Sequence, residues 1–161
     1  MTTNQQEWIQ ETAKAAIDSG HIFPQMAACE AALESGFGQS ALAREGNNLF
    51  GMKQHTHPGF GTFALPTKEY LDGVWVATTA DWIKYPTLAD CFEDRMATLK
   101  RLSTEYPHYG AALAATDPHT YINEVSQTWS TDPARAAKVM QIYNEYFPAV
   151  SPIPAIDAGD L

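Results

Sequence analysis

Two glutamates occur in sequence settings that suit acid–base chemistry. Glu34 stands near the end of a predicted helix, just before the Ser-Gly-Phe-Gly run 35–38, and Glu69 stands in the first strand of a predicted hairpin. The partial negative charge at a helix C-terminus, together with apolar neighbours such as Leu33 and Phe37, disfavours the ionised form of a carboxyl group. A carboxyl group that keeps its proton near neutral pH is what a general acid requires. On this reasoning, Glu34→Gln would leave the fold intact and slightly raise its stability near neutral pH.

Two carboxyl groups on separate elements that face one cleft suit glycoside hydrolysis. We therefore predict that Glu34 and Glu69 face one groove, with their carboxyl groups farther apart than the roughly 5–5.5 Å of a retaining pair. The structural alternatives are a surface glutamate that ends a helix and a cross-strand partner in a hairpin.

Aromatic side chains are numerous in the chain, with 4 Trp, 7 Tyr and 7 Phe. Sugars are often bound against aromatic faces, although an aromatic stripe more often belongs to a core. Polar loop residues such as Asn47, Asn48 and Gln54 have groups that bind a ligand's amides and hydroxyls or that cap turns. The aromatic residues near the two glutamates are Phe37, Phe50, Phe60, Phe63, Tyr70, Trp75, Trp82, Tyr85 and Trp129.

Other catalytic chemistries have weak support in the sequence. His55 and His57 alternate without a nearby third ligand, which is a weak metal signal. Cys29 and Cys91 have no histidine at an interpretable spacing, so the sequence does not support a thiol nucleophile. We interpret them as two small buried hydrophobic residues, with a single disulfide bridge as the alternative. No glycine-rich phosphate loop follows a predicted strand. We expect neither a metal nor an organic cofactor.

The charge balance limits the partners of this 161-residue chain. Its 10 Lys and Arg against 19 Asp and Glu give a net charge of −9, whereas nucleic-acid binding needs clustered basic residues. An anionic membrane surface is disfavoured for the same reason, and no apolar run approaches the roughly 18 residues of a membrane helix. A neutral sugar polymer remains compatible with this composition, and we expect a monomer.

Periodicity predicts helices on both sides of one hairpin. Asp72-Gly73 suits a two-residue turn between short runs rich in strand-forming residues. The predicted class is α+β, mainly α, with one domain over residues 1–150 that carries a small β-hairpin lobe, and a flexible tail at 151–161. The predicted helices cover 6–19, 24–34, 40–45, 88–102, 110–115, 118–126 and 133–146, and the hairpin covers 68–78.

Two motifs resemble a known family. The run Ala-Ala-Leu-Glu-Ser-Gly-Phe-Gly-Gln-Ser at 31–40, followed by Asn-Leu-Phe-Gly-Met-Lys at 48–53, is similar to the signature of the bacterial endo-β-N-acetylglucosaminidases, glycoside hydrolase family 73. This group includes the flagellar rod-associated peptidoglycan hydrolase. The Lys-Glu-Tyr hairpin at 68–70 and the Trp-Ser-Thr-Asp-Pro run at 129–133 occur in the family's order. The resemblance covers roughly residues 22–146.

The resemblance implies a lysozyme-like helical fold that hydrolyses peptidoglycan. Glu34 matches the family's general acid, and Glu69 matches a second carboxylate on the hairpin whose role varies among members. Trp129 stands where the family usually has a Tyr, Ile83 stands where an Arg is common, and Arg135 follows in a stretch that usually has a Tyr after Asp-Pro. We predict that the substrate is bound by Phe37, Asn48, Phe50, Lys53, Tyr70, Trp82, Tyr85 and Trp129.

The predicted function is hydrolysis of β-1,4 glycosidic bonds in peptidoglycan glycan strands, as an endo-β-N-acetylglucosaminidase. The alternatives are a muramidase or a lytic transglycosylase on the same polymer, and a non-catalytic peptidoglycan-binding protein. The polar start of the chain lacks the pattern of a cleavable signal peptide. For an enzyme that acts on the bacterial cell wall, this suggests a phage endolysin, an effector exported by another route, or a chain without its leader.

Overall fold

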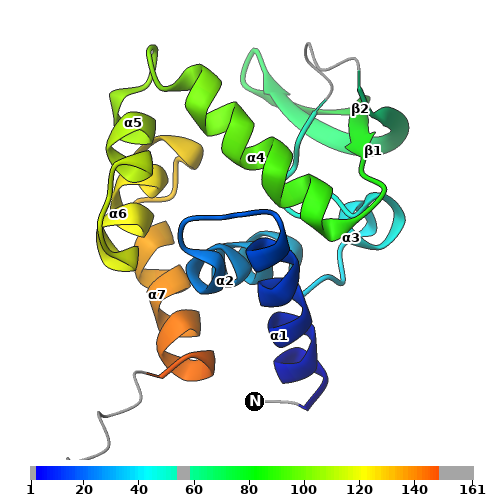
Figure 1. The fold of residues 1–161 in the computed structure, drawn as a ribbon. Helices are drawn as coiled ribbons and strands as arrows, with labels where there is room; N and C mark the ends of the chain where they lie inside the picture. The colour runs from blue at the N-terminus through cyan, green and yellow to red at the C-terminus, as the bar shows by residue number, and fades with distance from the viewer. Residues whose placement is uncertain (1–2, 54–58, 149–161) are drawn as a thin grey trace, which may run out of the picture.

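The computed structural model describes residues 3–53 and 59–148. Within these ranges, helices precede and follow one hairpin along the chain (Figure 1). The order of elements agrees with the predicted mainly helical α+β class. The elements are α1 (Thr3–Asp18), α2 (Pro24–Ser35), α3 (Ala41–Gly46), β1 (Gly61–Leu71), β2 (Val74–Lys84), α4 (Leu88–Leu102), α5 (Pro107–Leu113), α6 (Pro118–Trp129) and α7 (Arg135–Tyr146).

Local capping explains where several helices begin and end. Pro24 occupies the first turn of α2, and Gly36 ends that helix in the left-handed conformation with φ 59°. Thr87 caps α4 because its hydroxyl oxygen accepts a hydrogen bond from the Asp90 backbone N–H at 3.1 Å. The bounds of α4 are those predicted from this cap.

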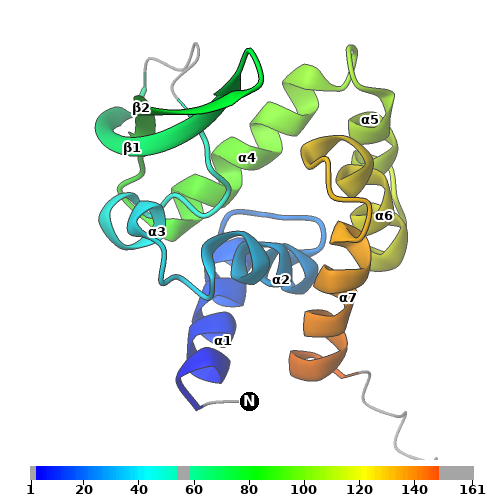
Figure 2. The same cartoon turned by 180° about the vertical axis from the view of Figure 1, so that it is seen from behind.

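Helix α2 forms the centre of the helical body. Its small residues are buried over most of its length, and α2 packs against both α1 and α7 (Figure 2). Small side chains allow helices to approach closely, so α2 contributes to both hydrophobic core clusters. Ile17 of α1 is 58% exposed, whereas its neighbour Ala16 is buried. The buried side chains of α2 are Met26, Ala27, Ala28, Cys29, Glu30, Ala31, Ala32 and Ser35.

The hairpin is longer than the sequence predicted. The strands β1 and β2 pair over eleven residues each, from Gly61 opposite Lys84 to Leu71 opposite Val74. Pro66 lies within β1, which pairs on one side only among the described strands, and proline is tolerated in such edge strands. Asp72 and Gly73 both have positive φ, 50° and 79°, as a type I′ turn requires.

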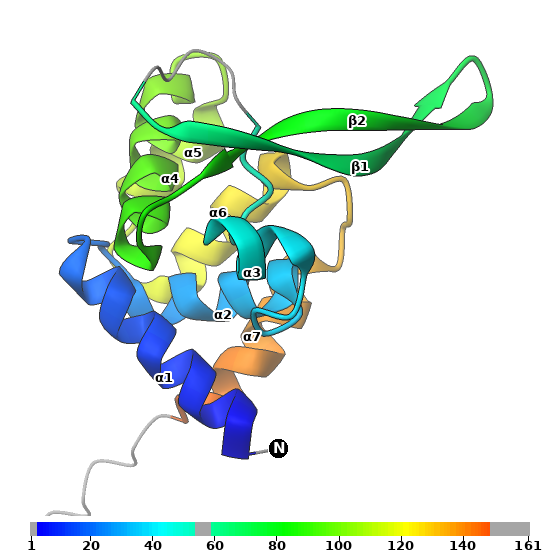
Figure 3. The same cartoon turned by 90° about the vertical axis from the view of Figure 1, so that its right-hand side faces the viewer.

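The base of the hairpin is anchored to the helical body, whereas its tip projects away from it (Figure 3). Backbone hydrogen bonds join the Ile83 N–H to the Met52 carbonyl at 3.0 Å and the Tyr85 N–H to the Gly46 carbonyl at 2.8 Å. The large apolar side chains at the tip are exposed, including Trp75 at 67%. Within the described ranges, no helix is long and apolar enough to span a membrane.

Candidate active site

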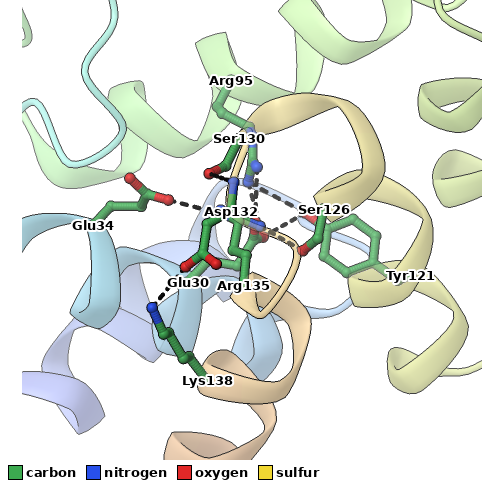
Figure 4. Close-up of polar contacts among 9 residues, drawn as sticks. All are labelled: Glu30, Glu34, Arg95, Tyr121, Ser126, Ser130, Asp132, Arg135 and Lys138. Atoms are coloured by element: carbon green, nitrogen blue, oxygen red, sulfur yellow. Dashed lines mark hydrogen bonds and ion pairs between the residues drawn. The ribbon is translucent and has the colours of Figure 1, made fainter.

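Glu34 lies one residue before the end of α2, where the left-handed Gly36 turns the chain away. The side chain of Glu34 is 28% exposed, so it stands at the boundary between the helical body and solvent. Its Oε1 accepts a hydrogen bond from Nε of Arg135 at 2.9 Å (Figure 4). The candidate acid is therefore held by a cation from α7 rather than surrounded by apolar side chains, as the sequence had suggested.

Behind Glu34 lies a group of buried polar side chains, Glu30, Arg95, Tyr121 and Arg135, which we call the buried charge cluster. Oε2 of Glu30 accepts hydrogen bonds from Nη2 of Arg95 and from Nη2 of Arg135, both at 2.8 Å. Oε1 of Glu30 accepts from Nη1 of Arg95 at 2.9 Å and from the Tyr121 hydroxyl at 2.7 Å. Four helices, α2, α4, α6 and α7, thus meet at one carboxylate.

The ion pairs determine the charge states of this cluster. Burial alone would raise the pKa of Glu30, but the guanidinium groups of Arg95 and Arg135 outweigh it and hold that pKa well below its usual range. Burial, together with Arg95, lowers the pKa of the neighbouring His21 to about 4. His21 is therefore neutral at pH 7, and its Nδ1 accepts a hydrogen bond from the Phe23 N–H at 2.9 Å.

Arg95 also joins the cluster to an aromatic wall. Its guanidinium carbon lies 4.3 Å from the ring centroid of Phe50 and 4.3 Å from that of Trp129. Such cation–π contacts stabilise a desolvated guanidinium. Phe50 and Trp129 also line a cleft of about 500 Å³, together with Lys53 and Tyr109. The cleft and Glu34 are thereby connected through one continuous set of side-chain contacts.

Several predicted substrate-binding residues have structural partners instead. Asn48 is buried: its amide nitrogen donates to the carbonyls of Met52 and Ile83, and its amide oxygen accepts from the Met52 N–H. The buried Tyr85 donates its hydroxyl hydrogen to Asp94. These side chains position the loop before β1 and the end of β2, so the geometry does not support direct substrate contact by either.

Phe37 also packs inward, against Trp8 and Tyr146 at centroid distances of 5.9 and 5.6 Å. It belongs to the edge of a core cluster rather than to the cleft. Its φ of 56° places it in the left-handed region, in the turn that follows α2.

The remaining predicted residues lie on or near the hairpin. Nζ of Lys53 lies 5.3 Å from the ring centroid of Trp82, and the two residues form an isolated β-bridge. Tyr70 is 61% exposed and packs against Trp75 near the tip of the hairpin. Glu69 pairs with Val76 across the hairpin, and the structure describes its backbone but not its side chain.

Nucleophilic and metal chemistry have no further support among the residues that the structure describes. Cys29 and Cys91 are both buried and free, and burial raises the pKa of the Cys91 thiol to about 12. Within the same ranges, no group of three or more His, Cys, Asp or Glu side chains is placed to hold a metal ion. His55 and His57 lie outside the described residues.

Sequence reasoning missed the buried charge cluster. One signal was present: Glu30 and Glu34 are four residues apart, so they share a face of α2, and like charges at that spacing destabilise a helix unless cations lie nearby. The partners Arg95 and Arg135 come from distant parts of the chain, and nothing local identifies them as buried.

Comparisons with known proteins bear on the family and the fold of the chain. A model of the Glucosaminidase family, described as mannosyl-glycoprotein endo-β-N-acetylglucosaminidase, matches residues 10–147. The chain is 32% identical over 147 residues to a probable N-acetylmuramidase of Lactococcus lactis subsp. cremoris (strain MG1363), covering 87% of this chain and 32% of that protein. It is 29% identical over 135 residues to the peptidoglycan hydrolase FlgJ of Vibrio parahaemolyticus, covering 81% of this chain and 42% of that protein. The chain therefore spans about a third to two fifths of the length of these relatives.

A solved structure shares the fold. The catalytic domain of the autolysin Auto from Listeria monocytogenes is similar with a TM-score of 0.77 and 26% sequence identity, over 91% of this chain and 86% of that one. This similarity confirms the predicted fold class. Together with the family match over most of the chain, it shows that this protein belongs to the glucosaminidase family, glycoside hydrolase family 73.

Proposed function

We propose that this chain is a peptidoglycan hydrolase that cleaves β-1,4 glycosidic bonds of the glycan strand as an endo-β-N-acetylglucosaminidase. The observation that carries the proposal is the placement of Glu34, a partly exposed carboxyl group at the end of α2, held by Arg135 in a chain of the glucosaminidase family. In this mechanism Glu34 protonates the glycosidic oxygen as the bond to the anomeric carbon breaks.

The cleft walled by Phe50 and Trp129 is the proposed glycan-binding region. Its volume of about 500 Å³ and its aromatic lining suit sugar rings, which have apolar faces and polar rims. Lys53 adds a positive charge to this lining. The substrate carries carboxylate groups on its stem peptides, and such a cation attracts them despite the net charge of −9 on the chain.

Water attack on the anomeric carbon has two routes, one with Glu69 as general base and one with the substrate's own N-acetyl group as nucleophile. A general base inverts the configuration at the anomeric carbon, whereas neighbouring-group participation retains it. Proton NMR of the first reducing ends formed distinguishes the two. Retention together with an active Glu69→Gln variant assigns attack to the N-acetyl group, and inversion with an inactive variant assigns it to Glu69.

Product analysis tests which bond is cut. Purified peptidoglycan is digested, the new reducing ends are reduced with borohydride, and the modified sugar is read by mass spectrometry. Reduced N-acetylglucosamine supports the proposal, and Glu34→Gln under identical conditions provides the blank. Reduced N-acetylmuramic acid would instead assign a muramidase, the activity named for the Lactococcus lactis relative. An anhydro end would assign a lytic transglycosylase, and binding without soluble products would assign a non-catalytic glycan-binding protein.

A further inference from the structure

Arg135 donates hydrogen bonds to both glutamates of α2. It begins α7 and is 1% exposed. Its Nε donates to Oε1 of Glu34 at 2.9 Å, its Nη2 to Oε2 of Glu30 at 2.8 Å, and its Nη1 to Oγ of Ser126 at 2.9 Å. A guanidinium group is planar with its donors in fixed directions, so three partners at three nitrogens define its orientation. The carboxyl group of Glu34 is therefore held by a side chain that cannot rotate without breaking other contacts.

A second cation of α7, Lys138, is paired away from the glutamates. Asp132 lies in the turn before α7, where its Oδ1 accepts from the Ala134 N–H at 2.9 Å and its Oδ2 accepts from Nζ of Lys138 at 2.6 Å (Figure 4). These exposed contacts involve neither glutamate and not the side chain of Arg135. They therefore provide a control site on the same helix.

Charge counting suggests what the contact does during proton transfer. Glu30, Arg95 and Arg135 together have a net charge of +1, because one buried carboxylate faces two guanidinium groups. When Glu34 gives up its proton, the new negative charge forms 2.9 Å from Nε of Arg135 and brings the four side chains to neutrality. A fixed charge aimed at the place where opposite charge develops stabilises a transition state without reorganisation.

We propose that Arg135 is a positioning residue for Glu34: it orients the carboxyl group through Oε1 and stabilises the negative charge that forms there when the proton leaves. This inference rests on the assignment of Glu34 as general acid. Glu30 acts indirectly, as the buried anion that fixes the orientation of Arg135. The proposal predicts a loss in the chemical step rather than in substrate binding, because Arg135 is buried behind Glu34 and acts through it.

The experiment measures kcat and KM for release of reducing ends from soluble uncrosslinked glycan strands. Arg135→Gln is expected to lower kcat by about tenfold or more with KM within twofold of wild type, since small displacements of catalytic groups have effects of this size or larger. Arg135→Lys keeps the charge and is expected to recover part of the lost kcat. Lys138→Gln removes a cation from the same helix at the exposed Asp132 contact, and it is expected to keep wild-type kcat.

Removal of Arg135 leaves Glu30 buried with one guanidinium partner, which weakens the fold. Should Arg135→Gln not fold, Arg135→Lys carries the test, and circular dichroism verifies folding of every variant before kinetics. A folded Arg135→Gln with kcat within twofold of wild type would overturn the proposal, as would wild-type kcat in Arg135→Lys where Arg135→Gln does not fold. So would a kcat loss of the same factor in Arg135→Lys and Arg135→Gln, since that indicates a packing role rather than a charged one.

A double-mutant cycle separates this proposal from the assignment of Glu34. If Arg135 acts through Glu34, the change Arg135→Gln has little further effect on the residual rate of Glu34→Gln. An undiminished further loss would show that Arg135 acts elsewhere. A Glu34→Gln protein that retains activity would refute the proposed acid itself, whereas an inactive Glu34→Gln beside fully active Arg135 variants would refute the positioning role alone.

Discussion

Replacing Glu34 with Gln removes a transferable proton and keeps the size of the side chain. If Glu34 is the general acid, the leaving oxygen departs unprotonated, and general acid catalysis is typically worth about 10²–10⁴-fold. We expect the turbidity loss of a cell-wall suspension to slow by such a factor. Because Gln is nearly as good a helix former as Glu, α2 is retained. A well-folded variant that keeps more than about a tenth of wild-type activity would rule out Glu34 as the essential acid.

The structure reverses the effect on stability that the sequence suggested for this substitution. Glu34 was expected to be held in an apolar setting, but its Oε1 accepts from the buried Arg135 at 2.9 Å. A Gln oxygen keeps this hydrogen bond without the charge. Arg135 stays charged in the variant, so only the ion pair is lost. A pair with one partly exposed partner contributes up to about 1 kcal/mol, and the variant should be less stable by about that amount.

In a domain of this size, that loss lowers Tm by about 2–4 °C. Circular dichroism melts measure it, with Glu11→Gln as the control, since Glu11 is an exposed glutamate of α1. An unchanged or raised Tm in Glu34→Gln would show that the contact with Arg135 does not stabilise the fold.

Three further perturbations test neighbouring parts of the structure. Burial lowers the pKa of His21 from 6.5 to about 4 in the folded protein. As the pH falls, the unfolded chain therefore binds a proton at His21 before the folded protein does. The free energy of unfolding should consequently drop by about 2 kcal/mol between pH 7.5 and pH 5. Urea titrations at both pH values check this, and His21→Gln should remove most of the difference; an equal drop in both proteins contradicts it. Glu69→Gln should slow cell-wall lysis less than Glu34→Gln, and the opposite order would make Glu69 the more important carboxylate. Asn48→Ala deletes three buried hydrogen bonds and should lower the free energy of unfolding by about 2–3 kcal/mol, whereas a direct role in substrate binding would raise KM in a protein of unchanged stability.

Much of the fold was predictable because its signals are local. Pro24, Gly36 and the Thr87 cap mark helix ends through the chemistry of single residues. Asp72-Gly73 locates the turn of the hairpin for the same reason. The lengths of β1 and β2 were underestimated because pairing between strands, rather than propensity, extends them past Pro66 and Ala64.

Of the candidate site, the sequence allowed only Glu34 to be predicted from local signals. Glu34 has a recognisable motif and a place at a helix end, whereas its partner Arg135 is separated from it by about a hundred positions of chain. Whether Asn48 and Tyr85 face a ligand or the protein depends on the tertiary position of the β2 end, which local sequence does not specify. Trp129 was predicted as a sugar platform, and the structure adds that the ring also packs against Arg95, a contact no local pattern indicates.

The buried charge cluster is better explained by the orientation that it gives to Glu34 than by a contribution to the stability of the fold. Desolvation of buried ions offsets much of their attraction, so apolar residues of similar size can stabilise a core equally well. Glu30 and Glu34 stand one turn apart on α2, and a single guanidinium from α7 reaches both. Arg95 brings α4 to the same carboxylate and is itself held between Phe50 and Trp129. The orientation of the partly exposed carboxyl group at the end of α2 therefore depends on the packing of α4 and α7. A substitution that loosens either helix should change the orientation of the Glu34 carboxyl group before the fold is lost.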